Sequence, residues 1–222
     1  MHLNSELLFR KYLKTCFKNN YKVLEIGPAG YPSAFEVIVN NPTIEWHTVD
    51  FGNTEYIDSS VNNLTHILTS PYDFPILDDT YDIVLSGQVI EHVGKPWVWI
   101  KELKRITKPG GKILTINPIS WPYHEAPIDC WRIFPEGMAA LAEEADLILE
   151  LSLFESIEKE QLLIKNIVDI FIPGQSYNYT KDFKFLTFRT KWNKIINKIS
   201  YLRKRLLIPV EVSYDCVSIL KK

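Results

Sequence analysis

Residues 23–30 read Val-Leu-Glu-Ile-Gly-Pro-Ala-Gly, an apolar run that carries one acid and stops at a turn of small residues. Such a run is typical of a buried strand that ends in a tight turn. Small residues let a ligand approach the backbone, and the amides that open the following helix favour a carboxylate or a phosphate. The stretch therefore predicts a strand, turn and helix with a ligand at the carboxyl end of the strand.

The segments around this stretch alternate between buried strands and helices. We expect strands at 21–26, 46–49, 81–85, 112–116 and 147–154, and helices from 3 to about 19, at 33–39, 96–106 and 135–144. Lys108-Pro109-Gly110-Gly111 is expected to be a turn with two glycines at positive φ. Parallel strands need crossover connections and are buried on both faces. The pattern predicts an α/β fold with a Rossmann-like, doubly wound, mostly parallel sheet and helices on both faces.

Length and composition favour one globular domain. The chain has 222 residues with 46% apolar side chains, which excludes disorder, a collagen-like fibre and a disulfide scaffold. Its three cysteines form no Cys-x-x-Cys pair and no histidine is spaced for a zinc site, so spacing predicts no metal. The first residues do not form a secretory signal, and no run of about 18 apolar residues exists for a membrane span. A reducing, cytoplasmic location is expected.

Charge divides the chain unequally. Residues 1–150 carry a net charge of −8 and the remainder carries +6. The basic part predicts a helical insertion over 155–208, with a long amphipathic helix at 183–206, before a strand at 210–220 that pairs at or near a sheet edge. That helix could cover the sheet or a second subunit in a homodimer, contact an anionic membrane, or bind an acceptor that carries phosphate.

Asp50 closes the second strand, 23 residues after Gly27. A carboxylate there lies beside the first turn and can accept both hydroxyls of a ribose. A dinucleotide fingerprint requires Gly-x-Gly-x-x-Gly, but Gly27 is followed by Ala29, Gly30 and Ser33. A nucleoside-bearing ligand is therefore expected, and a nicotinamide-dependent oxidoreductase is disfavoured.

Three further motifs complete a family resemblance. They are Asp73-Phe74-Pro75-Ile76 with 79–84, Ser86-Gly87-Gln88-Val89-Ile90-Glu91-His92-Val93, and Lys108-Pro109-Gly110-Gly111. With the first turn and Asp50, residues 21–150 resemble the cofactor-binding core of class I S-adenosylmethionine-dependent methyltransferases with a type 11 domain. The resemblance implies an antiparallel terminal strand, S-adenosylmethionine as cofactor and S-adenosylhomocysteine as product.

The resemblance also implies roles for single residues. Asp50 would bind the ribose and Phe51 would lie beside the adenine. Ser70 stands where the family often has an aspartate for the adenine amino group, so Ser70 or Tyr72 is expected to assist there. The remaining implied cofactor-binding residues lie under the methionine end or line the methyl end: Glu25, Gly27, Pro28, Gly30, Ser86 and Gln88.

The stretch from His124 to Gly137 resembles a His-x-x-Pro-x-Asp-Tyr-Trp-Arg-x-Thr-Pro-Glu-Gly stretch of a subset of these enzymes, with Cys130 and Phe134 in place of the tyrosine and the threonine. It implies an acceptor pocket, with His124 or His92 as the base if the acceptor must lose a proton. His92 could instead cap or pack, and His124 could join Asp129 and Arg132 in a clasp. The expected acceptor-binding residues are Trp121, Tyr123, Glu125, Trp131 and Arg132.

The expected function is in-line methyl transfer from S-adenosylmethionine to oxygen on a small molecule or a sugar of a glycan precursor. Nucleic acid is not expected as a partner, because the aromatic loop lies in the acidic part. The alternative is a non-catalytic binding or scaffold module, favoured by the narrowed turn Ala29-Gly30-Tyr31 and by Ser70.

Overall fold

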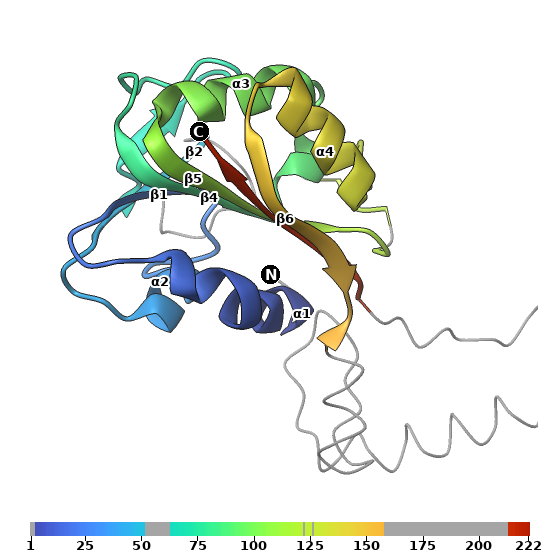
Figure 1. Ribbon diagram of the computed structural model, residues 1–222, viewed down its shortest axis with the longest axis horizontal. Coiled ribbons are helices and arrows are strands. Elements are labelled where there is room, and N and C mark those ends of the chain that lie inside the picture. Colours follow the sequence, from blue (N-terminus) through green and yellow to red (C-terminus); the bar gives the residue numbers. More distant parts are fainter. Residues whose placement is uncertain (1–2, 52–62, 122, 126, 158–212) are drawn as a thin grey trace, which may run out of the picture.

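The computed structural model describes residues 3–51, 63–121, 123–125, 127–157 and 213–222, and its described strands form one seven-stranded sheet (Figure 1). The strand order is β3-β2-β1-β4-β5-β7-β6. The strands are β1 (Lys22–Ile26), β2 (Glu45–Phe51), β3 (His66–Leu68), β4 (Tyr81–Gly87), β5 (Thr107–Pro118), β6 (Ile148–Glu155) and β7 (Asp215–Lys221).

The pairing confirms the fold class expected from the sequence. Strand β1 pairs in parallel with β2 and β4, and β4 pairs in parallel with β5. The terminal strand β7 is antiparallel to both β5 and β6 and lies between them, so β6 forms the edge. The short strand β3, beside β2 at the opposite edge, is not predicted by the sequence analysis.

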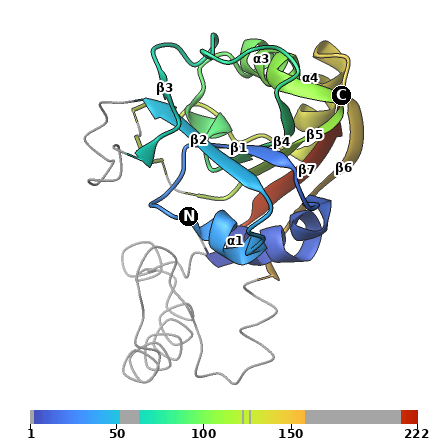
Figure 2. The same ribbon diagram turned by 90° about the vertical axis from the view of Figure 1, so that its left-hand side faces the viewer.

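Helices cover both faces of the sheet, as Figures 1 and 2 show. Helices α3 and α4 lie on one face, and α1 and α2 lie on the other. Neighbouring strand residues point to opposite faces, so Leu24 joins the core under α3 and α4 whereas Val23 joins the core under α1 and α2. The helical segments are α1 (Leu3–Leu8), η1 (Phe9–Leu13), η2 (Lys14–Cys16), α2 (Ala34–Val39), η4 (Ile90–His92), α3 (Pro96–Ile106) and α4 (Pro135–Glu144).

The N-terminal helix departs from the single α-helix expected. After α1, η1 is a π-helical turn and η2 a 3₁₀ turn that ends at Cys16. The wider π turn adds Phe9 to the buried face that holds Leu8 and Leu13. The Phe9 ring packs against Phe35 with a centroid distance of 4.4 Å. Aromatic packing with α2 therefore accompanies this change in helical geometry.

The glycine pair before the fifth strand also differs from expectation. Residues Lys108 to Gly111 belong to β5 itself, and only Gly110 of the two glycines has positive φ. Gly111 is instead closely packed, because a Cβ there would lie 2.9 Å from the carbonyl oxygen of Asp82. Glycine is favoured at position 110 by the positive φ and required at position 111 by the close approach of the neighbouring backbone.

A buried carboxylate joins the two ends of the described chain. Asp215 in β7 is fully buried and accepts hydrogen bonds from Asn4 Nδ2 (2.7 Å) and Gln88 Nε2 (3.0 Å). Ser5 and Ser213 donate to the same carboxylate. The network fixes α1 against the carboxyl end of β4.

The expected basic insertion falls almost entirely on residues 158–212, outside the described residues, so its boundaries and the helix at 183–206 stay predictions. In the described part of the chain, no helix combines the length and the apolar character needed to cross a membrane. Cys16, Cys130 and Cys216 are free thiols.

Candidate functional site

The turn after β1 is fixed at both ends. At its start, the Gly27 amide donates to the Val49 carbonyl of β2 (3.0 Å). At its end, Ser33 caps α2 by accepting from the Glu36 amide (3.1 Å) and donates its hydroxyl to Glu25. Gly27 and Gly30 have φ values of +66° and +88°. The chain therefore turns sharply between a strand and a helix that are held in place.

Glu25 supports the turn from beneath. Its carboxylate is buried in β1 and accepts from Ser33 Oγ and from Trp46 Nε1 (2.9 Å). Burial raises the pKa of Glu25 to about 7, with a smaller contribution from Glu36, although the two hydrogen bonds oppose the rise. This carboxylate therefore organises the turn through Ser33 and does not line the pocket beside the turn.

We expect the pKa of Glu25 to make stability depend on pH. A carboxyl whose folded pKa is raised stabilises the fold below its unfolded pKa of 4.5, and this contribution is lost as pH rises through about 7. At about 1.4 kcal/mol per unit, the change is about 3 kcal/mol. Denaturant unfolding should show that the free energy of unfolding of Glu25→Gln falls less steeply between pH 4.5 and 7.5 than that of the wild type. The exposed Glu144→Gln control should keep the wild-type slope; equal slopes in all three proteins would contradict the assignment.

A small pocket that is open to solvent lies beside this turn. The parallel register pairs Ile26 with Val49, which places Asp50 next to Gly27. Asp50 Oδ1 accepts from the Phe51 amide (2.7 Å), and burial raises the pKa of the Asp50 carboxyl. The pocket is lined by Pro28, Gly30, Tyr31, Thr48, Asp50, Asn63 and Leu64.

The other residues expected around the cofactor lie outside the lining of this pocket. Phe51 packs against the core under α3 and α4, and Ser86 is buried at the end of β4. Ser70 Oγ accepts from the Tyr72 amide, and the Tyr72 hydroxyl accepts from the Lys95 amide. Gln88 turns its side chain to Ser5 and Asp215. The structure thus brings Pro28, Gly30 and Asp50 together, and cofactor contacts for the others stay predictions.

A second cluster lies where the loop after β5 meets η4. The Cys130 amide donates to the Glu91 carbonyl (2.8 Å), and Trp131 Nε1 donates to the Val93 carbonyl (2.9 Å). His92 Nδ1 lies 2.6 Å from the Ile128 carbonyl oxygen, which can only accept a hydrogen bond. These contacts attach the loop to η4, which follows β4 at the same sheet edge as the first turn.

Contacts among His124, Asp129 and Arg132 hold the loop together, as in the clasp that the sequence analysis gives as the alternative role for His124. Arg132 binds Asp129 through both carboxylate oxygens (2.5 and 2.7 Å) and donates to the Trp121 carbonyl (3.1 Å). The His124 amide donates to the same aspartate (2.8 Å). The Arg132 guanidinium holds the pKa of Asp129 well below its usual range. Asp129 and Arg132 therefore have a clear structural role in shaping the loop.

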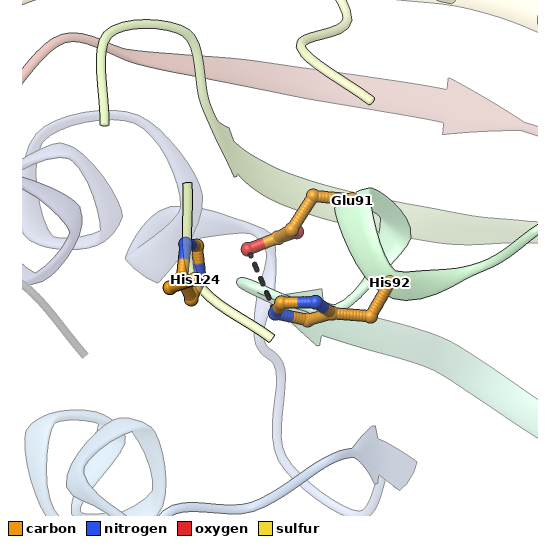
Figure 3. Close-up of side chains that lie close together, drawn as sticks. All are labelled: Glu91, His92 and His124. Atoms are coloured by element: carbon orange, nitrogen blue, oxygen red, sulfur yellow. Dashed lines mark ion pairs between the residues drawn. The ribbon is translucent and has the colours of Figure 1, made fainter. Parts of the chain in front are cut away.

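Glu91, His92 and His124 face one another inside this arrangement (Figure 3). The two imidazole rings meet edge to face, with centroids 4.9 Å apart. Burial raises the pKa of Glu91 to about 8 and lowers the pKa of His92, so the His92 imidazole is neutral at pH 7. The cluster combines a neutral imidazole with a buried carboxyl group.

Some of the side chains expected to bind the acceptor are exposed to solvent, and others pack against or hydrogen-bond to neighbouring residues. Tyr123 is 71% exposed and donates its hydroxyl to the exposed Glu125 (2.8 Å). Trp131 packs edge to face against Trp97, with centroids 6.2 Å apart. Glu91 is absent from the residues expected at the site, although it stands next to His92 in the motif at residues 86–93. Ser33 begins a Ser-x-x-Glu pattern typical of a helix N-terminus, but no local pattern ties Ser33 to Glu25 or Thr48 to the pocket.

Comparisons with known proteins find similarity to methyltransferases. Residues 31–115 match the sequence model of the methyltransferase-domain family. A stretch of 53 residues, 24% of this chain and 19% of the relative, is 45% identical to an uncharacterised methyltransferase of Schizosaccharomyces pombe. A stretch of 97 residues, 40% of this chain and 36% of the relative, is 33% identical to one of Mycobacteroides abscessus.

The fold also matches solved structures. Phosphoethanolamine N-methyltransferase 2 of Haemonchus contortus, solved with phosphomonomethylethanolamine and S-adenosylhomocysteine, superposes with a TM-score of 0.58 at 15% identity. The match covers 99% of this chain and 52% of that one. At this identity the likeness shows the fold alone. The sequence alignments span about a fifth to a third of the curated relatives described above.

Proposed function

Because this chain has the class I methyltransferase fold and carries a methyltransferase domain, we propose that it transfers a methyl group from S-adenosylmethionine to an acceptor. The observation that carries the proposal is the pocket in which Pro28, Gly30 and Asp50 meet at the carboxyl ends of β1 and β2. In open α/β sheets, ligands bind outside the carboxyl ends of the strands, which is where this pocket lies. The family match thus supports the activity, and the pocket supports the place at which we propose that the cofactor binds.

The residues present fit the cofactor. Asp50 offers a half-buried carboxylate for the ribose hydroxyls, and Gly30 leaves open space at the turn, because a Cβ there would meet no atom within 4 Å. The exposed Tyr31 lines the pocket without closing it. When bound, S-adenosylmethionine supplies a methyl group that is already activated by a sulfonium. The protein then has to orient the acceptor and exclude water.

We propose oxygen as the attacked atom and His92 as the base. A hydroxyl acceptor must lose its proton as it attacks, which requires a group that can take that proton. His92 directs Nδ1 to the Ile128 carbonyl, so in the neutral ring the proton-accepting atom is Nε2. Burial keeps this ring neutral near pH 7. His124, whose ring lies against it, is the second candidate.

A polar small molecule or a sugar of a glycan precursor is the acceptor class we propose. The loop presents the hydroxyl of Tyr123 and the carboxylate of Glu125 on its exposed side, and such groups suit a hydroxylated ligand. Dimer formation, membrane contact and recognition of an acceptor phosphate were expected of the helix at 183–206, which lies outside the described residues. Those three stay predictions.

Isothermal titration calorimetry of the full chain tests the proposal. We expect saturable binding of S-adenosylmethionine and S-adenosylhomocysteine at one site and no binding of NADH, because the dinucleotide glycines are missing. Absence of heat at millimolar S-adenosylhomocysteine would overturn the proposed cofactor. Binding with no methyl transfer to any hydroxylated acceptor would favour the binding or scaffold module.

A further inference from the structure

Glu91 is a buried carboxyl group whose oxygens lack ordinary partners. The residue is fully buried, and among the described residues neither oxygen accepts a hydrogen bond of normal geometry. Burying such a group unpaired is costly, so buried carboxylates are normally hydrogen-bonded, paired with a cation or bound to a metal. Glu91 points toward His92 and His124 (Figure 3). A cation between these side chains would supply the missing partner.

The orientation of His92 supports a cation at this place. Its Nδ1 lies 2.6 Å from the Ile128 carbonyl oxygen, so Nδ1 carries the hydrogen and Nε2 of the neutral ring carries a lone pair. Nε2 faces Glu91 Oε1 at 3.7 Å, a distance too long for a hydrogen bond. Metal-binding histidines commonly donate their other ring nitrogen to a backbone carbonyl in this way.

His124 completes the group from the loop after β5. Each of the three side chains offers one ligand atom: a ring nitrogen from His92, a ring nitrogen from His124 and a carboxylate oxygen from Glu91. These three atoms lie within 4.8 Å of one another. His124 Nδ1 lies 3.4 Å from Asp129, whose side chain is only 1% exposed and is held by Arg132. A carboxylate behind an imidazole orients the ring and raises its basicity as a ligand. The loop segment that carries this ligand is thus anchored.

We propose that Glu91, His92 and His124 form a binding site for a divalent first-row transition-metal ion, of which Zn²⁺ is the probe. With metal bonds of about 2.1 Å, tetrahedral ligand atoms lie about 3.4 Å apart. The 3.7 Å from Glu91 to His92 is close to this spacing. Two imidazoles and one carboxylate suit zinc and its neighbours better than Mg²⁺ or Ca²⁺, which prefer oxygen ligands.

Three protein ligands leave a fourth coordination position for water or for another ligand atom. Residues 92 and 124 are 32 positions apart, so spacing along the chain predicts no such site. The loop contacts to Glu91, His92 and Val93 bring them together. The inference concerns metal binding alone and does not rest on methyl transfer or on the cofactor. A bound ion would occupy the lone pair of His92 Nε2, so His92 can act as the proposed base only in the metal-free chain.

Metal titration of the full chain tests this site. The protein is treated with EDTA, dialysed, and titrated with Zn²⁺ in a calorimeter and with Co²⁺ by visible absorption. We expect one equivalent to bind, with cobalt bands that indicate nitrogen and oxygen ligation. His124→Ala and Glu91→Gln should each weaken affinity at least about tenfold. The absence of saturable binding of one equivalent to the wild-type chain would overturn the proposal.

His66→Ala is the matched control, because His66 lies with His47 around the Tyr81 hydroxyl, in a separate histidine pair. It should bind one Zn²⁺ with wild-type affinity. If His124→Ala binds as tightly as wild type, or if His66→Ala loses binding equally, the assignment is wrong. His124 lies in a loop, so its variant remains informative even if Glu91→Gln fails to fold.

S-adenosylhomocysteine calorimetry on the same variants separates the two proposals. A His124→Ala protein that loses zinc but keeps S-adenosylhomocysteine binding is folded and supports the metal site. If the wild type binds zinc without binding S-adenosylhomocysteine, the metal site stands and the proposed function fails. If it binds S-adenosylhomocysteine without zinc, the metal site fails and the proposed function stands.

Discussion

Replacing Asp50 with alanine is expected to weaken S-adenosylhomocysteine binding about 100-fold or more. The carboxylate lines the pocket at the end of β2 and is placed to accept two ribose hydroxyls. Hydrogen bonds to a charged group contribute about 1.5–3 kcal/mol each, and a 100-fold loss corresponds to about 2.7 kcal/mol. Calorimetry at constant salt and pH measures this loss directly.

Two further variants show whether the loss is specific. Asp50→Asn keeps one acceptor oxygen and should lose about tenfold, between wild type and Asp50→Ala. Asp146→Asn changes a carboxyl group whose side chain is 93% exposed, just past the end of α4, and should bind as wild type does. Full affinity in Asp50→Ala would show that the ribose site lies elsewhere.

Replacing Gly27 with alanine should cost about 2–5 kcal/mol of the free energy of unfolding and abolish cofactor binding. Its φ of +66° costs an L-residue about 1–2 kcal/mol. In addition, the new Cβ would lie 2.6 Å from Val89 Cγ2, and overpacking of this kind costs about 1–3 kcal/mol. The turn that lines the pocket would have to shift away from η4.

Gly30→Ala is the control that separates these two causes. Gly30 has a φ of +88°, but a Cβ there would meet no atom within 4 Å. Gly30→Ala should therefore lower the free energy of unfolding only by the cost of the positive φ. Adding Val89→Ala should restore part of the stability of Gly27→Ala and none of that of Gly30→Ala. Denaturant unfolding gives all of these values. Equal losses for the two single glycine variants would contradict the close contact with Val89.

Much of the fold follows from local sequence. The predicted bounds of α3 and α4 agree with the structure, because proline at the first turn and three-to-four apolar spacing are signals carried by the segment itself. The position of Asp50 beside the first turn also follows, because parallel strands end at one edge. Strand β3 has only three residues, which is too short for an apolar pattern that would predict a strand.

The sequence by itself determined the α/β class, the turn between Gly27 and Gly30, and the carboxylate of Asp50 beside it. These follow from the period of apolar residues and from backbone freedom, which act over a few residues. Only the tertiary structure directed Gln88 to Asp215 and brought His124 to Glu91 and His92. Those placements depend on hydrogen bonds and burial between distant segments, and no local pattern in the chain records which distant groups will meet.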